Sequence, residues 1–158
     1  WGGFATTILL SVMFIGGCGG STTCGIKVFR LQVLASTAKV QISRLLRPHA
    51  VVLAYYNKRP VSVEVMDSVM GFFYLFILGF VLIAIMLGIA GLDFVTALSG
   101  AATSISNVGP GLGEVIGADG NFSTLPDSAK WIMTFAMLLG RLEIFTVLVM
   151  LNPAFWQR

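Results

Sequence analysis

Three long stretches of this sequence are almost free of charge, and they constrain the fold more than any other feature. Residues 1–26 and 68–92 hold no charged side chain, and residues 131–150 hold only Arg141 and Glu143. Each stretch is long enough to cross a bilayer, because a membrane-spanning helix needs about 20 apolar residues. The sequence therefore predicts an integral membrane protein with several crossings.

The composition excludes several other classes of protein. Only 11% of the 158 residues are charged and 56% are apolar, with a mean hydropathy of +0.90, whereas soluble domains carry roughly 25% charged residues. A nucleic-acid binder, a disulfide-stapled secreted domain and a disordered tail do not fit these values. Cys18 and Cys24 have no companion ligands for a metal site. The first residue is not methionine and no targeting segment is visible, so we expect a piece of a longer protein.

The distribution of charge predicts a topology. The segment between the first two apolar stretches is basic and reaches residue 64 before its first acid; its cations are Lys27, Arg30, Lys39, Arg44, Arg47, Lys58 and Arg59. Loops rich in lysine and arginine stay in the cytoplasm. The few charged residues of segment 92–131 are mostly acidic, and this segment is expected outside. The basic segment serves either this topogenic role alone or also a docking surface for a cytoplasmic partner or anionic lipid.

Two helices are expected around this basic segment. Apolar residues recur at helical spacing before Pro48, which predicts an amphipathic helix along the inner interface; they are Leu31, Leu34, Ala35, Ala38, Ile42, Leu45 and Leu46. A spanning helix is then expected over 66–91, with Glu64 and Asp67 near its positive end.

The apolar run 94–106 is too short to cross. As a helix of thirteen residues it reaches roughly 20 Å, against a hydrocarbon core of about 30 Å, so the chain must turn back. Asp93 is suited to cap the helix, and Pro110 disfavours helical geometry at the preceding residue. Backbone carbonyls are then left at membrane depth, namely those of Ile105, Ser106, Asn107, Val108 and Gly109.

Two interpretations of this re-entrant segment remain open. Irregular backbone at membrane depth is tolerated only where it is buried in protein or lines a water-filled cavity. The carbonyls can replace the hydration shell of a cation, which indicates an ion pore. Alternatively, the segment is a structural hairpin that plugs a helix bundle.

Two further features are unusual within apolar stretches. A glycine-rich run interrupts the first stretch, which favours either an unwound loop that lines a cavity or close helix packing; the run comprises Gly16, Gly17, Cys18, Gly19, Gly20, Ser21, Thr22, Thr23, Cys24 and Gly25. Arg141 lies near the centre of the last stretch and cannot face lipid. It is either part of an intramembrane ion pair or a functional charge in a hydrated pathway, and Glu143 is badly placed to neutralise it from the same helix.

Three motifs together resemble the Trk/Ktr/HKT potassium transporter family, in particular its bacterial TrkH/TrkG branch. They are MFIGGCGGSTTCGIKVFR at 13–30, SISNVGPGLG at 104–113 and GRLEIFTVLVMLNPAFW at 140–156. The resemblance covers essentially the whole chain in the right order.

The resemblance implies an all-α membrane protein with four M1–pore–M2 units arranged pseudo-fourfold, of which this chain is the C-terminal third. Residues 1–39 would be the broken M2 helix of the third unit, with a gating loop at 16–25, and 40–65 a basic cytoplasmic linker. The fourth unit would occupy 66–153, followed by a cytoplasmic C-terminus at 154–158. Within that unit the expected parts are M1 at 66–91, the pore helix at 94–106, the filter at 105–110, an outer loop at 111–126 and M2 at 127–152.

The resemblance also implies roles for individual residues. Residues 105–110, from Ile105 to Pro110, would form the fourth part of a selectivity filter, with Gly109 as the filter glycine and K⁺ at the carbonyls of Asn107 and Val108. The gating loop would lie beneath the filter, opposite Arg141 as the pore-facing charge. Cys24 departs from the family pattern, where glycine is expected, and should stiffen the loop.

The implied function is K⁺ uptake across the bacterial inner membrane by a multi-pass protein that is not an enzyme and needs no cofactor. Expected partners are membrane lipid, three upstream filter units of the same polypeptide, a second copy in a homodimer and a TrkA-type nucleotide-binding regulator; nucleic acid is not expected. A broken-helix carrier for another solute is the alternative. An intramembrane hydrolase is disfavoured because His49, the only histidine, lies in the cytoplasmic segment.

Overall fold

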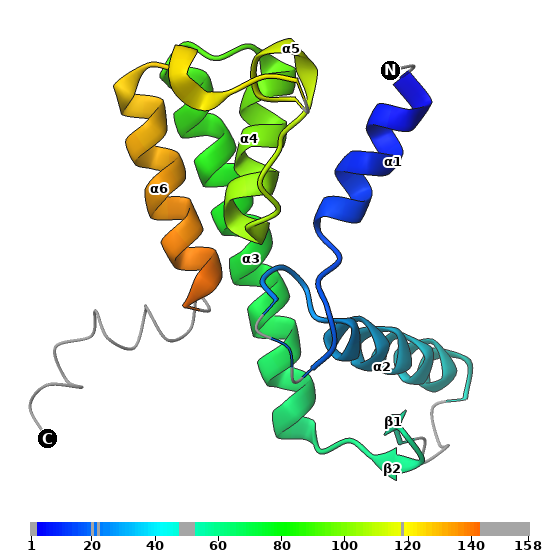
Figure 1. The fold of residues 1–158 in the computed structure, drawn as a ribbon. Helices are drawn as coiled ribbons and strands as arrows, with labels where there is room; N and C mark the ends of the chain where they lie inside the picture. Colours follow the sequence, from blue (N-terminus) through cyan, green and yellow to red (C-terminus); the bar gives the residue numbers. More distant parts are fainter. Residues whose placement is uncertain (1–2, 20, 22, 48–52, 118, 143–158) are drawn as a thin grey trace, which may run out of the picture.

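The fold is a set of helices with one small hairpin (Figure 1). A computed structural model describes residues 3–19, 21, 23–47, 53–117 and 119–142. The elements in chain order are α1 (Gly3–Met13), α2 (Val28–Leu46), β1 (Tyr55–Tyr56), β2 (Arg59–Pro60), α3 (Val63–Ile89), α4 (Phe94–Ser106), α5 (Gly113–Ile116), the 3₁₀ helix η1 (Phe122–Thr124) and α6 (Asp127–Arg141).

Helix α3 is the long apolar element to which the others attach. Among the described residues it is the one helix long and apolar enough to cross a membrane, with 27 residues and a mean hydropathy of 2.8 over its most apolar window. It begins at Val63, three residues before the predicted start, because the hydroxyl of Ser62 accepts a hydrogen bond from the N–H of Val65 at 3.5 Å. Glu64 lies in its first turn, as expected.

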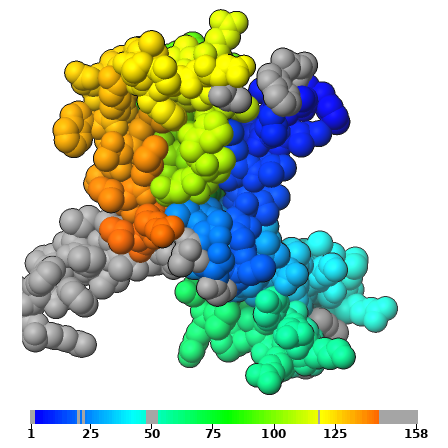
Figure 2. Space-filling model, in the orientation of Figure 1, coloured from blue at the N-terminus to red at the C-terminus, as the bar shows by residue number. Residues whose placement is uncertain are grey.

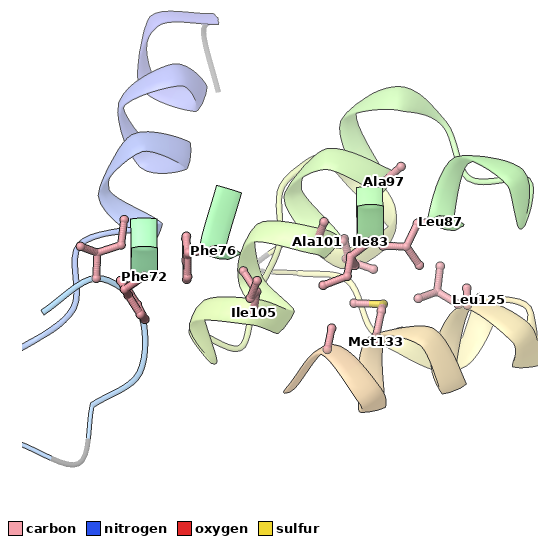
Figure 3. Packing of buried hydrophobic residues seen from close by; sticks show 13 residues of the cluster. Phe72, Phe76, Ile83, Leu87, Ala97, Ala101, Ile105, Leu125 and Met133 are labelled. Atoms are coloured by element: carbon pink, nitrogen blue, oxygen red, sulfur yellow. The ribbon is translucent and has the colours of Figure 1, made fainter. Parts of the chain in front are cut away.

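Helix α4 is buried between α3 and α6 and forms the centre of the structure (Figure 3). Its bounds coincide with the predicted short helix. Small side chains along it let the neighbouring helices approach closely. The core cluster includes Phe76, Ile83 and Leu87 of α3, Ala101 and Ile105 of α4, and Met133 and Ala136 of α6. The short helix is therefore the most deeply buried element of the described chain.

Both ends of α4 are fixed by short polar side chains. Asp93 is the N-cap, as predicted, and its carboxylate accepts a hydrogen bond from the N–H of Thr96 at 3.2 Å. The helix stops at Asn107, which adopts the left-handed conformation with φ 53° and ψ 45°. The N–H of Val108 then donates to the carbonyl of Thr103 at 3.0 Å, the hydrogen bond of a Schellman motif. The helix therefore ends at Asn107, three residues before Pro110, from which the sequence analysis inferred the end of the helix.

Helix α2 occupies the segment where an amphipathic helix was predicted before Pro48, but its boundary and its buried face differ from those expected. It runs across the direction of α3 (Figure 1), and it continues past residue 39, so the expected boundary between broken helix and linker falls inside one helix. Its buried residues are Val33, Thr37 and Val40. The predicted apolar stripe lies largely on the other side, with Leu45 and Leu46 mostly exposed.

A two-stranded hairpin follows α2 in the segment predicted as a linker. Tyr55 pairs with Pro60 and Tyr56 with Arg59 in antiparallel register. Both turn residues have positive φ, 47° at Asn57 and 64° at Lys58, as a two-residue hairpin turn requires. Ser36 of α2 binds the hairpin through its hydroxyl, which lies 3.1 Å from the carbonyl oxygen and 3.2 Å from the nitrogen of Tyr55.

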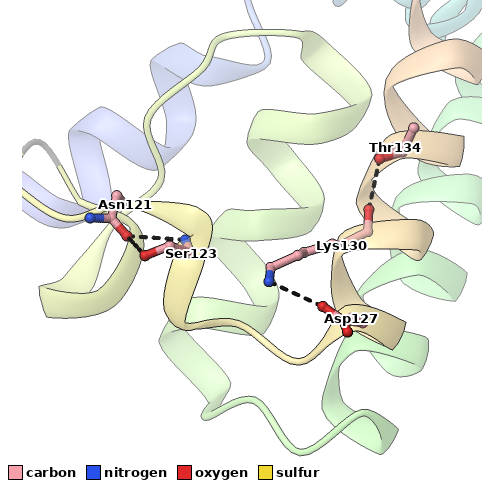
Figure 4. Close-up of polar contacts among 5 residues, drawn as sticks. All are labelled: Asn121, Ser123, Asp127, Lys130 and Thr134. Carbon is pink, nitrogen blue, oxygen red and sulfur yellow. Dashed lines mark hydrogen bonds and ion pairs between the residues drawn. The ribbon is translucent and has the colours of Figure 1, made fainter.

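The segment between α4 and α6 lies at the end of the molecule opposite the hairpin (Figure 1), and Figure 4 shows its polar contacts. Asn121 caps η1 by accepting hydrogen bonds from the N–H and the hydroxyl of Ser123. At the start of α6 the Lys130 ammonium lies 3.2 Å from the Asp127 carboxylate. This exposed pair contributes little to stability, so α6 is held mainly by its packing on α4.

The close approach of α4 and α6 gives a test of this packing. A Cβ added at Gly140 would overlap the carbonyl oxygen of Ile105, so we expect Gly140→Ala to lower the free energy of unfolding by about 1–3 kcal/mol. Gly88→Ala is the matched control, because Gly88 lies in α3 with no atom near the added Cβ. Thermal unfolding of the full-length protein in detergent measures both; equal stability of the two variants would contradict the packing.

The cap of α4 predicts a pH dependence. Hydrogen bonds from the Thr96 hydroxyl and N–H lower the pKa of Asp93, which lies in the exposed turn after α3, below its ordinary value of 3.8. The carboxylate therefore contributes stability above that pH and loses it as the pH falls through the lowered value. We expect Asp93→Ala to lose roughly 0.5–2 kcal/mol near neutral pH. Unfolding measured from about pH 6 to about pH 3 should show a smaller acid loss in this variant than in the wild type.

Candidate functional site

Exposure changes abruptly at the carboxyl end of α4. Ile105 is 0% and Ser106 5% exposed, whereas Val108 is 44% exposed. The whole run 107–110 is exposed. The candidate filter segment, defined here as residues 107–110, is therefore a stretch of accessible, non-helical backbone that follows directly on a buried helix.

Two consecutive N–H groups of the filter segment point back at α4. The N–H of Val108 donates to the carbonyl of Thr103 at 3.0 Å, and the N–H of Gly109 donates to the Thr103 hydroxyl, also at 3.0 Å. In a trans peptide the N–H and the preceding C=O point in opposite directions. The carbonyls of Asn107 and Val108 therefore point away from α4, on the exposed side of the segment.

The structure separates the first two predicted filter residues from the others. Ile105 and Ser106 form the last turn of α4 and are buried. The carbonyl of Ile105 faces Gly140 of α6, close to where a Cβ would lie. The exposed part of the predicted filter is therefore residues 107–110, and the role of residues 105–110 as a filter stays a prediction.

Two further hydrogen bonds hold the filter segment and the residues after it, one to α6 and one to α4. The Asn107 amide donates to the carbonyl of Met137 on α6 at 3.0 Å. The N–H of Leu112 donates to the Ser99 hydroxyl at 3.0 Å, one turn before Thr103 on α4. Gly109, between these anchors, has φ +114°, a region that only glycine adopts without strain.

An apolar groove separates the filter segment from α1. It has a volume of about 540 Å³ and is lined by α1 on one side and by the filter segment and the residues after it on the other. Figure 2 shows the surface of α1 beside that of the α4 region. The exposed backbone therefore borders a space that a further part of a larger protein, or solvent, can share.

The glycine-rich run predicted at 16–25 lies between the end of α1 at Met13 and the start of α2 at Val28. The whole connection, residues 14–27, is called the glycine-rich loop below. Ile15 and Ile26 form a parallel bridge at its base, in which the N–H of Gly16 donates to Ile26 at 3.0 Å and the N–H of Ile26 to Phe14 at 2.9 Å. The N–H of Val28 donates to Gly17 at 3.1 Å. In the view of Figure 1 the loop lies below the carboxyl end of α4.

Arg141 joins this loop to α6. It is the last residue of α6, where a positive charge is favourable, and its guanidinium donates to the Cys24 sulfur at 3.8 Å. Cys24 is buried, with 9% of its surface exposed. Its backbone does not adopt the positive φ that would favour glycine at this position. The structure thus brings together the predicted loop and the predicted charge.

A cavity of about 200 Å³ lies between the loop, α3 and α6. Three basic side chains line it, Lys27, Arg30 and Arg141, together with Ser21 and Thr23 of the loop. The Arg30 guanidinium stacks on Phe72 of α3, 3.9 Å from the ring centroid. Among the described residues that line this cavity, three are basic and none is acidic.

Some predicted residues lie outside the described part of the chain. Gly20 and Thr22 of the loop, Glu143, and residues 143–158, which hold the expected remainder of M2 and the C-terminus, are outside it. Conversely, three residues that contact the carboxyl end of α4 or the segment after it were not predicted, namely Thr103, Ser99 and Gly140. The four-residue spacing of Ser99 and Thr103 on one helix face was the available signal.

Comparisons with known proteins agree on one family. The TrkH family model, described as a cation transport protein, matches residues 1–158. The chain is 47% identical over its whole length to the Trk system potassium uptake protein TrkI of Halomonas elongata, and 38% identical over 99% of its length to TrkH of Escherichia coli K12. In both cases it spans 32% of the relative's length.

A solved structure shows the same fold. The crystal structure of the potassium transporter TrkH from Vibrio parahaemolyticus matches with a TM-score of 0.88 and 41% identity, covering 99% of this chain and 33% of that one. The predicted match to about a third of a longer Trk protein is confirmed. The chain belongs to the TrkH family of cation transport proteins.

Proposed function

We propose that this chain contributes one filter segment and one gate to a pathway for K⁺ uptake across a bacterial inner membrane. The observation that carries the proposal is the pair of N–H groups at Val108 and Gly109 that donate to Thr103. They turn the carbonyls of Asn107 and Val108 outward, and carbonyl oxygens are the groups that replace the hydration shell of K⁺. The relatives TrkI and TrkH are Trk system potassium uptake proteins, which supports the same ion.

The proposed pathway needs more chain than is present. One filter segment offers too few carbonyls to surround an ion, and this chain spans about a third of its relatives. In our proposal the remaining polypeptide supplies three further filter segments in a pseudo-fourfold, multi-pass arrangement. The groove of about 540 Å³ beside residues 107–110 borders the shared conduit. A homodimer and a TrkA-type cytoplasmic regulator are part of the same proposal.

The proposed gate is the glycine-rich loop with Arg141. In our proposal the basic side chains that line the cavity, Lys27, Arg30 and Arg141, lie beneath the filter and raise the free energy of a cation there. The contact of Arg141 with Cys24 holds the loop against α6. Opening then requires the loop to leave α6, which removes a steric and an electrostatic barrier together.

The filter is tested at Gly109. An alanine at φ +114° is strained by about 1–3 kcal/mol, so Gly109→Ala should reduce Rb⁺ uptake or K⁺/Na⁺ discrimination by on the order of tenfold. Gly113→Ala is the matched control, because Gly113 has φ +89° but lies outside the filter segment. Uptake and selectivity are measured in cells expressing the full-length protein. Wild-type values for Gly109→Ala would remove this residue from the filter.

The gate is tested at Cys24. Replacement by glycine removes the sulfur that accepts from Arg141 and frees the loop backbone, so we expect an unchanged K⁺/Na⁺ selectivity and a roughly two- to tenfold rise in the open-to-closed ratio. Cys18→Gly, at the exposed cysteine of the same loop, should leave gating unchanged. Patch recordings of the full-length protein measure both; an unaltered open probability in Cys24→Gly would count against the gate.

A further inference from the structure

Thr103 occupies an unusual place for a hydroxyl side chain. It is 0% exposed, in the last turn of a helix whose neighbours are apolar or small. A buried hydroxyl without a hydrogen bond costs roughly 1–3 kcal/mol in a protein interior. Here the hydroxyl accepts from the N–H of Gly109 at 3.0 Å, whereas the buried hydroxyls of Ser104 and Ser106 on the same helix have no such partner among the described residues.

The two oxygens of Thr103 differ in whether they depend on the type of side chain at this position. Its carbonyl accepts from Val108, and any residue at this position would supply that oxygen. Its hydroxyl accepts from Gly109, and only serine or threonine supplies an oxygen there. The orientation of the Asn107 carbonyl therefore depends on the backbone alone, whereas that of the Val108 carbonyl depends on the Thr103 side chain.

Gly109 makes this dependence strong. Glycine populates positive and negative φ about equally, so the peptide plane between Val108 and Gly109 has little intrinsic preference for its observed orientation. No second N–H follows, because residue 110 is proline. The hydrogen bond from Gly109 to the Thr103 hydroxyl is therefore the interaction that fixes this plane, and its loss lets the Val108 carbonyl turn toward α4.

We propose that Thr103 is a positioning residue for ion selectivity, whose hydroxyl holds the Val108 carbonyl outward as a ligand for a dehydrated cation. The inference rests on the proposed function and adds a specificity-determining residue outside the filter segment. Thr134 of α6 is the matched comparison, because its hydroxyl donates to the carbonyl of Lys130, one turn earlier on its own helix.

The test uses four variants of the full-length protein. Thr103→Val keeps the shape and removes the hydroxyl, Thr103→Ser restores it, and Thr134→Val removes a threonine hydroxyl that is bonded within α6. We expect the K⁺/Na⁺ permeability ratio to fall at least about tenfold in Thr103→Val and to stay near wild type in the other two. Thr103→Ala, which fits any site that holds threonine, should show the same loss as Thr103→Val and replaces it if valine prevents folding.

A second readout is independent of transport. Amide hydrogen exchange at Gly109 should accelerate at least about tenfold in Thr103→Val, whereas exchange at Val108, which is bonded to a main-chain oxygen, should not change. Wild-type selectivity in Thr103→Val and Thr103→Ala would overturn the inference, as would an equal loss in Thr103→Ser or Thr134→Val. If the wild type did not transport K⁺, the proposed function would fail, while exchange at Gly109 would still decide whether the hydroxyl holds the peptide.

Discussion

Backbone N–H and C=O groups in an apolar environment need partners within the protein, and this requirement shapes the whole region around the end of α4. A helix that stops inside the molecule leaves its last carbonyls and the following N–H groups without helical partners. Asn107 turns the chain in the left-handed conformation, and Thr103 then takes two N–H groups at once. The local solution for the donors leaves acceptors facing outward, which is the property an ion filter needs.

Helix α6 connects the candidate filter segment to the glycine-rich loop. Asn107 is bonded to Met137 of α6, and the Ile105 carbonyl lies against Gly140, one residue before Arg141. Arg141 in turn contacts Cys24 in the glycine-rich loop. These contacts form a continuous path from the filter segment through α6 to the loop. A shift of α6 in our proposal therefore acts on both ends of the pathway.

The sequence predicted the features that depend on neighbouring residues and not those that depend on distant contacts. The spanning helix and the short helix follow from runs without charge, and the cap at Asp93 follows from a short carboxylate before an apolar run. The direction of α2 is set by its packing on α3, and the hairpin places Lys58 at positive φ, which few lysines adopt. The packing of the Ile105 carbonyl depends on Gly140, which is distant in sequence.

The burial of α4 between α3 and α6 also bears on how such a protein is made. Helix α3 precedes α4 in the chain and α6 follows it, so one wall of the site for α4 is synthesised after α4 itself. Thirteen residues with several hydroxyls are too short and too polar to be retained in lipid alone. The packing site of α4 is therefore complete only after α6 has been synthesised, so we expect α4 to take its final position late in the insertion of this unit.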